Sequence, residues 1–432
     1  MPVTNDALSH ADDLADFVAA SPSSYHAAEE VARRLEESGF VRLEETDAWP
    51  TQAGGRFVVV RDGAAIGWVV PADAAATTPA QVFGAHTDSP GFKLKPRPTT
   101  GSRGWLQAGV EVYGGPLLNS WLDRELRLAG RLALADGRVV LADTGPLLRL
   151  PQLAVHLDRG VNNNGLALDK QSETQPVWGL GDPTEEDLLG ELAASAGVNA
   201  ADIRGFDAVV ADSARGAVFG KDKAFFASGR LDDLASVHAG VVALAGASRS
   251  TASGELTGIA VLAAFDHEEL GSETRSGAAG PFLEDILARI YAGLGADLTE
   301  QRRAFAASWH LSSDVGHSVH PNYAHKHDPV VQPLLGSGPI LKINANQRYA
   351  TDAIGAAAWA GWCESAGIAS QEFVSNNAVP CGSTIGPITA TRLGIRTVDV
   401  GIPILSMHSA RELAGVSDLH ALARVAESFF AA

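Results

Sequence analysis

Three acidic residues and one histidine follow one another directly after an apolar stretch. The stretch, 258–264, is short, uncharged and partly β-branched, which predicts a buried strand. Phe265 follows the stretch, and the next four residues are Asp266, His267, Glu268 and Glu269. Carboxylates this close repel one another and are costly to bury unless a cation lies among them. The cluster therefore indicates either a solvated acidic turn or a site where one glutamate binds a metal and its neighbour transfers protons.

Acids and histidines stand at four other places where a strand is expected to end or a glycine is near. Open α/β sheets bind ligands at the carboxyl ends of their strands. Oxygen and imidazole donors without a cysteine cluster suit Zn²⁺, Mn²⁺ or Co²⁺. Two ions that share one carboxylate, each with a position open for water, need about five protein ligands. The five stretches supply that number, namely His86, Asp232, Glu269, Asp314 and His408.

Each of these residues also has an ordinary structural interpretation. A single histidine such as His408 is more often hydrogen-bonded in a core or on a surface than bound to a metal. Asp232 suits the N-cap of a helix, and Asp314 suits a turn. Taken singly, only His86 and Glu269 favour a metal. Their joint occurrence beside strand ends favours a metal site, because the ordinary interpretations do not predict it.

Other catalytic patterns are incomplete. Gly271 stands four residues after His267, so the H-E-x-x-H zinc motif is absent. There is no G-x-S-x-G elbow, and 179–181 lacks the third glycine of a dinucleotide-binding loop. Cys381 is a candidate nucleophile, although a buried structural cysteine is favoured there.

The composition limits the class of protein. A chain of 432 residues predicts two domains, and 46% hydrophobic with 19% charged residues is typical of a globular protein. The formal charge of −18 argues against nucleic-acid binding and against anionic membrane surfaces, and an acidic substrate would need a local basic group. Two cysteines, no signal-peptide pattern and no apolar span of membrane length predict a soluble cytoplasmic protein.

The elements that must position these residues fall into two regions with different secondary-structure patterns. Amphipathic periodicity predicts two helices within 5–40. Further helices are predicted at 185–196, 231–245, 282–294, 298–307, 353–366 and 417–430. Strands are predicted at 56–61, 64–70, 81–85, 105–113, 126–134, 258–265, 341–343 and 395–401. From 231 onward strands and helices alternate, which indicates an α/β sheet covered on both faces. The block from 92 to 228 is instead predicted to be β-rich and inserted.

Seven motifs occur in a fixed order along the chain, namely 84–90 (GAHTDSP), 230–234 (RLDDL), 266–272 (DHEELGS), 313–317 (SDVGH), 320–323 (HPNY), 380–387 (PCGSTIGP) and 407–412 (MHSARE). Together they resemble the M18 family of metallo-aminopeptidases, the aspartyl aminopeptidases. The resemblance runs from about Asp16 to the C-terminus. The motifs are specific as a set, although no single one is.

The resemblance implies an α/β fold with two domains. Residues 1–91 and 229–432 would form an α/β/α sandwich peptidase domain, and 92–228 an inserted β-rich dimerisation domain. It also implies self-association into dimers and a tetrahedral homo-dodecamer, in which dimer contacts complete the active sites.

The resemblance further implies two Zn²⁺ per subunit, with Mn²⁺ or Co²⁺ as alternatives. His86 and Asp314 would hold one ion, Glu269 and His408 the other, and Asp232 would bridge them. Asp88 would hydrogen-bond the imidazole of His86 and fix its tautomer. The peptide bond between Asp232 and Asp233 is expected to be cis.

In this family pattern Glu268 is the general base. It would take a proton from a water that bridges the metals and deliver the proton to the leaving amine. His156 would reach the neighbouring subunit's site and stabilise the oxyanion. Lys342 would face an acidic N-terminal side chain. Without the family pattern we would expect His156 packed on a strand and Lys342 solvated. His267 has no assigned role.

These implications predict an aminopeptidase that removes Asp or Glu from the free N-terminus of peptides. An aminopeptidase of broader specificity or an N-acyl amino acid deacylase would use the same two metals. A cage-forming scaffold is the non-enzymatic alternative, and an intact Glu268 beside an intact ligand set argues against it.

Overall fold

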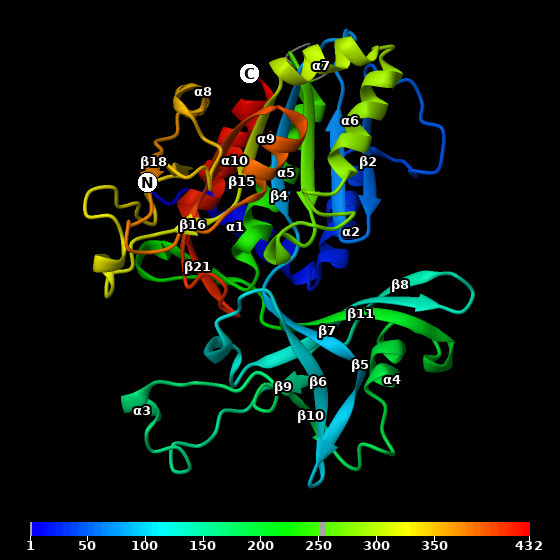
Figure 1. The fold of residues 1–432 in the computed structure, drawn as a ribbon, viewed down its shortest axis with the longest axis vertical. Coiled ribbons are helices and arrows are strands. Elements are labelled where there is room, and N and C mark those ends of the chain that lie inside the picture. Colours follow the sequence, from blue (N-terminus) through cyan, green and yellow to red (C-terminus); the bar gives the residue numbers. More distant parts are fainter. Residues whose placement is uncertain (1, 251–255) are drawn as a thin grey trace.

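A nine-stranded sheet forms the centre of the larger part of the molecule (Figure 1). In this computed structural model of the chain, residues 2–250 and 256–432 are described. The strands lie in the order β1 (Val41–Arg42), β2 (Arg56–Arg61), β3 (Ala64–Val69), β14 (Ile259–Phe265), β4 (Ala80–His86), β15 (Trp309–Ser313), β19 (Arg396–Gly401), β17 (Ile340–Lys342) and β18 (Gln371–Phe373). The adjacent strands β14, β4, β15 and β19 run parallel, so their carboxyl ends share one edge.

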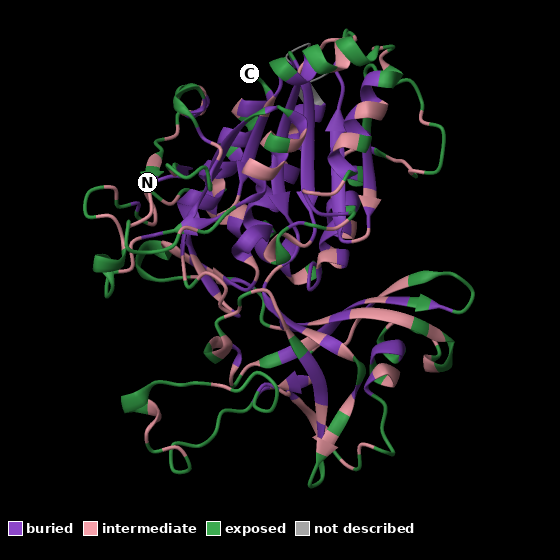
Figure 2. Ribbon diagram, in the orientation of Figure 1, coloured by how far each residue is buried: buried purple, intermediate pink, exposed green. Residues whose placement is uncertain are grey.

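Helices cover both faces of this sheet. One apolar core is shared by α1 (Asn5–Ala20), α2 (Ser24–Glu37), α5 (Leu231–Ser250), α8 (Ala353–Ala366) and α10 (Val416–Phe430). A second core, on the opposite face, involves α6 (Phe282–Gly293), α7 (Leu298–Ala307) and α9 (Ile385–Leu393). Figure 2 shows the sheet buried between these two layers. The predicted α/β/α sandwich is therefore confirmed.

A seven-stranded antiparallel sheet forms the other part of the molecule. Its order is β11 (Ile203–Asp212), β5 (Gly91–Ser102), β6 (Trp105–Tyr113), β10 (Val177–Leu180), β9 (Leu148–Arg149), β7 (Glu125–Leu134) and β8 (Val139–Asp143). Because β11 pairs with both β5 and β7, the sheet curls into a barrel-like shape. Helix α4 (Leu188–Ser195) packs against it. This confirms the inserted β-rich region, whose role in dimerisation stays a prediction.

A third, five-stranded sheet links the two parts. It consists of β12 (Ala217–Phe219), β13 (Phe225–Ser228), β21 (Glu412–Gly415), β20 (Pro403–Leu405) and β16 (Gly316–His317). Strand β13 pairs antiparallel with β21, with Phe225 opposite Gly415. The last strand of the seven-stranded sheet, β11, ends at Asp212, before the predicted boundary at 228. The short strand β13, which lies between these two positions, pairs with the distant strand β21 instead of joining that sheet.

The element predictions differ from the structure mainly at short or interrupted segments. Helices α7 and α8 have the predicted bounds, whereas α5 continues to Ser250, beyond the predicted end at 245. No element was predicted for β15 or α9. Gly386 and Pro387 at the start of α9 are residues that disfavour helix interiors, so the residue pattern carried no helix signal there. The helix forms because proline is tolerated in a first helical turn. Among residues 2–250 and 256–432, no helix is both long and apolar enough to cross a bilayer.

Candidate metal centre

Three neighbouring parallel strands bring the first candidate ligands together. His86 is the last residue of β4, and Asp314 directly follows β15. Glu268 and Glu269 lie in the short 3₁₀ turn η4 (Glu268–Leu270), three residues after β14 ends. The turn begins at His267, whose φ of 63° is left-handed. This reversal places both adjacent glutamates at the strand edge instead of on opposite sides of a strand.

A loop and the start of a helix supply the remaining two ligands. Asp232 lies in the first turn of α5 with non-helical backbone angles, and its peptide bond to Asp233 is cis, as predicted. His408 follows β20 in a left-handed conformation with φ 64°. The buried carboxylate of Glu412 accepts the backbone N–H of Asp232 at 3.0 Å and that of His408 at 2.7 Å. The sequence assigned no role to Glu412, although it ends the 407–412 motif.

The carboxylate of Asp232 lies between the two histidines. Its Oδ1 is 3.2 Å from Nε2 of His86, and its Oδ2 is 3.4 Å from Nε2 of His408. On the outer sides, Oδ1 of Asp314 is 3.8 Å from His86 Nε2, and Oε1 of Glu269 is 3.4 Å from His408 Nε2. The structure thus brings all five predicted ligands into one cluster.

The cluster fits a divalent metal ion. Two donor atoms that each lie about 2.1 Å from a tetrahedral zinc ion are about 3.4 Å apart, close to the spacings found here. Within the described residues, three groups of three donor atoms lie within 4.8 Å of one another, and all three belong to this cluster. Oδ1 of Asp232 is buried without a hydrogen-bond partner among the described residues. The mixed imidazole and carboxylate set suits zinc.

The ionisable groups of the cluster change one another's pKa values. Burial raises the pKa of Glu268 to about 7 and that of Glu269 well above its ordinary value, with the Asp232 carboxylate adding to the effect on Glu269. Burial alone would lower the pKa of His408, yet Asp232 and Glu269 raise it to about 10. Protons therefore offset negative charge in this cluster, and a divalent cation competes with them for the same atoms.

Asp88 supports the cluster differently from the prediction. Its carboxylate accepts the backbone N–H groups of Glu268 at 2.9 Å and Glu269 at 3.1 Å. The Nδ1–H of His86 donates to the main-chain carbonyl of Asp88 at 3.1 Å, while the carboxylate is 3.4 Å away. The hydrogen bond that orients His86 therefore comes from the main-chain carbonyl of Asp88 and not from its side chain, because the carboxylate of Asp88 is turned towards η4. Nε2 of His86 still faces Asp232.

The two remaining predicted residues occupy contrasting places. His156 is exposed in the loop between β9 and α3 (Val161–Asn164), outside the cluster, so the strand-packed alternative is wrong. Lys342 is buried at the end of β17, so the solvated alternative is also wrong. Its Nζ donates to the carbonyl of Val315 at 2.8 Å and is 3.5 Å from Oδ2 of Asp314.

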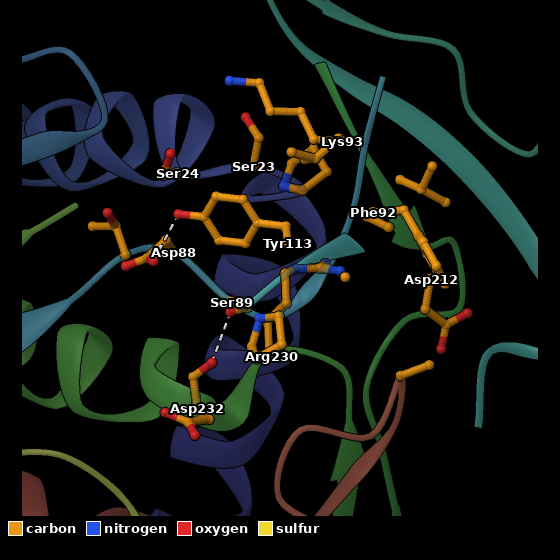
Figure 3. Close-up of a pocket in the computed structure, with 18 of the residues that line it drawn as sticks. Ser23, Ser24, Asp88, Ser89, Phe92, Lys93, Tyr113, Asp212, Arg230 and Asp232 are labelled. Carbon is orange, nitrogen blue, oxygen red and sulfur yellow. Dashed lines mark hydrogen bonds between the residues drawn. The ribbon is translucent and has the colours of Figure 1, made fainter. Parts of the chain in front are cut away.

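Two cavities adjoin the cluster. The larger, of about 720 Å³, is lined on one side by the ligands and Glu268, and elsewhere by Lys342, Tyr349 and Phe373. This volume suits a small peptide. The smaller, of about 50 Å³, lies behind the cluster, where Tyr113 reaches Asp88 (Figure 3). His267 lines the smaller cavity, with Nδ1 3.1 Å from Thr274 Oγ1, and stays without a catalytic role.

Comparison with known proteins gives one consistent result. A family model described as aminopeptidase I zinc metalloprotease (M18) matches residues 17–430. A probable M18 family aminopeptidase 2 of Streptomyces coelicolor is 53% identical over 422 residues, covering 97% of each chain. Ape4 in the cryo-EM complex with Nbr1 superposes with a TM-score of 0.95 and 33% identity, over 100% of this chain and 88% of that one. The structure of the S. cerevisiae mApe1 dodecamer superposes with a TM-score of 0.84 and 29% sequence identity, over 97% of this chain and 96% of that one.

Proposed function

The chain belongs to the M18 family of zinc metallo-aminopeptidases, and on this premise we propose that it uses two zinc ions to remove N-terminal residues, preferentially Asp or Glu, from peptides. The observation that carries the proposal is the carboxylate of Asp232. One of its oxygens faces His86 and the other faces His408, as a ligand shared by two ions requires.

The proposed ligand set follows from these pairings. His86 and Asp314 would hold one ion, Glu269 and His408 would hold the other, and Asp232 would be a ligand of both. Zn²⁺ is the proposed metal, with Mn²⁺ or Co²⁺ as alternatives that the same donors accept. When bound at these residues, the metal would supply Lewis-acid chemistry, which would polarise the scissile carbonyl and lower the pKa of the attacking water.

Glu268 is the proposed general base. Its backbone is held by Asp88, and its carboxylate lies within 4.8 Å of donor atoms of His86 and Glu269. From this position the carboxylate takes a proton from the attacking water and then delivers it to the nitrogen of the leaving amine. The other carboxylates attract the substrate's N-terminal ammonium, which explains a requirement for a free N-terminus.

Lys342 is the proposed determinant of acidic specificity. An ammonium group has three protons, and among the described residues the oxygen contacts found for Nζ are Val315 and Asp314. The remaining donor capacity is available in the larger cavity for a substrate carboxylate. In a chain with a net charge of −18, this buried cation provides the local attraction that an acidic side chain needs.

His156 is the proposed contribution of a neighbouring subunit. Its loop carries the exposed apolar residues Leu153, Val155 and Leu157, which favours burial against another chain. A solved relative is a dodecamer, and we extend dimers and a tetrahedral dodecamer to this chain. In that assembly the imidazole stabilises the oxyanion of the neighbour's reaction.

Subunit exchange tests the shared site. In a mixed pair of His156→Phe and Glu268→Gln subunits, both substitutions fall in one active site. The other site keeps its own Glu268 and receives the neighbour's intact His156, so a mixture should regain part of the activity. No gain after verified exchange would assign His156 to a purely structural role.

Metal content and substrate choice test the main proposal. We expect purified protein to contain two zinc ions per chain and to hydrolyse an Asp-anilide faster than a Leu-anilide. A chelator should abolish both activities, and N-acetyl-Asp should not be cleaved. Activity that is indifferent to chelation would contradict the metal mechanism, and cleavage of N-acetyl-Asp would favour a deacylase.

The proposed compartment is the cytoplasm. Cys363 and Cys381 are both free of disulfides, as is usual for proteins of a reducing compartment.

A further inference from the structure

A three-residue segment from the β-rich sheet contacts both sides of the metal centre. The segment, 113–115, begins at the last residue of β6. The hydroxyl of Tyr113 donates to Oδ2 of Asp88 at 2.9 Å (Figure 3). The same carboxylate accepts the backbone N–H groups of Glu268 and Glu269, and the carbonyl of Asp88 accepts Nδ1–H of His86. Tyr113 therefore helps to orient Asp88, and Asp88 in turn contacts His86, Glu269 and Glu268, the proposed histidine ligand, glutamate ligand and base.

The next two residues contact the other side of the centre. The carbonyl of Gly115 accepts Nδ1–H of His408 at 3.0 Å, which leaves Nε2 facing Asp232 and Glu269. Gly114 has a left-handed φ of +66°, and a Cβ there would lie 3.3 Å from Cβ of Glu269. A Cβ at Gly115 would lie 3.5 Å from Nδ1 of His408. The two glycines thus allow the main chain to approach both ligands closely.

Two residues that follow this segment also form hydrogen bonds with the loop that carries His408. The N–H of Leu117 donates to the carbonyl of His408 at 2.9 Å, and Oγ of Ser120 accepts the N–H of Ala410 at 2.8 Å. The loop that carries His408 is therefore fixed to the β-rich sheet through several main-chain contacts. The other supports described here, Asp88 and Glu412, belong to the peptidase part of the chain.

We propose that Tyr113, Gly114 and Gly115 are positioning residues for both zinc sites, so that the β-rich sheet is part of the metal-binding apparatus. This inference rests on the proposed di-zinc function. Outer partners of metal ligands fix ring orientation and donor strength, and their loss typically lowers metal affinity or activity about 10–100-fold. A shift of the β-rich sheet against the sandwich would therefore change zinc affinity as well as assembly.

A competitive zinc titration of the full-length protein tests the role of Tyr113. We expect Tyr113→Phe to weaken binding of at least one ion by about 10–100-fold, with kcat reduced at limiting zinc and KM for the Asp-anilide unchanged. Tyr291→Phe is the matched control. Its buried hydroxyl donates to the carbonyl of Thr78 at 2.8 Å, away from the centre, and it should bind zinc like the wild type.

A pair of glycine variants tests the close approach. Gly114→Ala should weaken zinc binding, whereas Gly104→Ala should not, because Gly104 has a similar φ of +79° with nothing within 4 Å of an added Cβ. Circular dichroism verifies that each variant is folded. Wild-type zinc affinity in both Tyr113→Phe and Gly114→Ala would overturn the inference, as would equal losses in Gly104→Ala and Gly114→Ala. A wild-type protein that binds no zinc would instead overturn the proposed function.

Discussion

Two groups of histidines in this molecule have opposite electrostatic environments. In the metal centre the pKa of His86 and His408 lies above the ordinary value although burial alone would lower it, because Asp232 and other carboxylates face both rings. Where α1, α5 and α10 pack together, a second group is formed by His10, His238 and His420. There burial and neighbouring positive charge keep each pKa below the ordinary value.

The two groups differ in how many carboxylates contact the histidine rings directly. The rings of His10 and His238 have centroids 4.7 Å apart, and Asp13 Oδ2 lies 2.7 Å from His238 Nε2. In the described part of the chain, the groups of three donor atoms close enough to share a metal all lie in the metal centre. Buried histidine alone therefore does not make a metal site. The proposed metal site is the group in which several carboxylates add negative charge that a cation would offset.

The largest expected effect comes from removing the carboxylate that we propose to be shared by two ions. Asp232→Asn should reduce peptidase activity to the level of the uncatalysed blank and abolish stoichiometric zinc binding, because both proposed ions would lose a ligand. The matched change in the other group, Asp13→Asn, should leave kcat and zinc content unchanged and lower the free energy of unfolding by about 1 kcal/mol. Anilide hydrolysis, metal analysis and urea unfolding measure these quantities. Equal loss of activity in both variants would remove the distinction between the groups.

Glu268→Gln should have the next largest effect, within the metal centre alone. The amide keeps the shape of the side chain but does not accept the proton, so kcat should fall about 10²–10⁴-fold while the zinc content stays that of the wild type. Glu273→Gln, an exposed substitution five residues along the chain, is the control and should retain full activity. Retained activity in Glu268→Gln would show that the base is misassigned.

Substitution of Lys342 should change specificity more than rate. Lys342→Met preserves the buried aliphatic stem, so the ratio of kcat/KM for Asp- over Leu-anilide should fall towards 1 while Leu-anilide hydrolysis persists. Lys221→Met, on the exposed surface, should leave the ratio unchanged. An unaltered ratio in Lys342→Met would place the determinant of acidic preference elsewhere.

The smallest effect is expected in the stability of the second group. A histidine whose folded pKa is depressed binds fewer protons than it does in the unfolded chain, so stability falls as pH drops through the ordinary value of about 6.5. Burial, the neighbouring histidines and the positive charges of Arg34 and Arg424 depress the pKa values. The opposing carboxylates are Asp6, Asp13, Glu30 and Glu427.

Removing one member of the group should flatten this pH dependence. His10→Gln should lose about 1 kcal/mol less unfolding free energy than the wild type between pH 7.5 and 5.5. Comparing the two proteins in the same buffers cancels the contribution of the metal centre. Parallel stability curves would show that the His10 imidazole does not contribute.

Local patterns in the sequence predicted much of the fold. Helices α7 and α8 were predicted with their observed bounds, and the Asp62–Gly63 turn between two apolar runs predicted the β2–β3 hairpin. The five candidate ligands were found from residue type and position beside strand ends. The pairing of β13 with β21 was not predictable, because a strand of four residues carries no signal for its partner.

The sequence by itself determined which residues supply charge and donor atoms, because residue chemistry is local. Only the tertiary structure decided which supports hold them. The hydroxyl of Tyr113, the carbonyl of Gly115 and the carboxylate of Glu412 come from distant segments, and two of their contacts involve the main chain. Main-chain groups are the same in every residue, so their partners depend on strand pairing and loop closure in space. Residue type therefore predicted the cluster, and the fold determined its geometry.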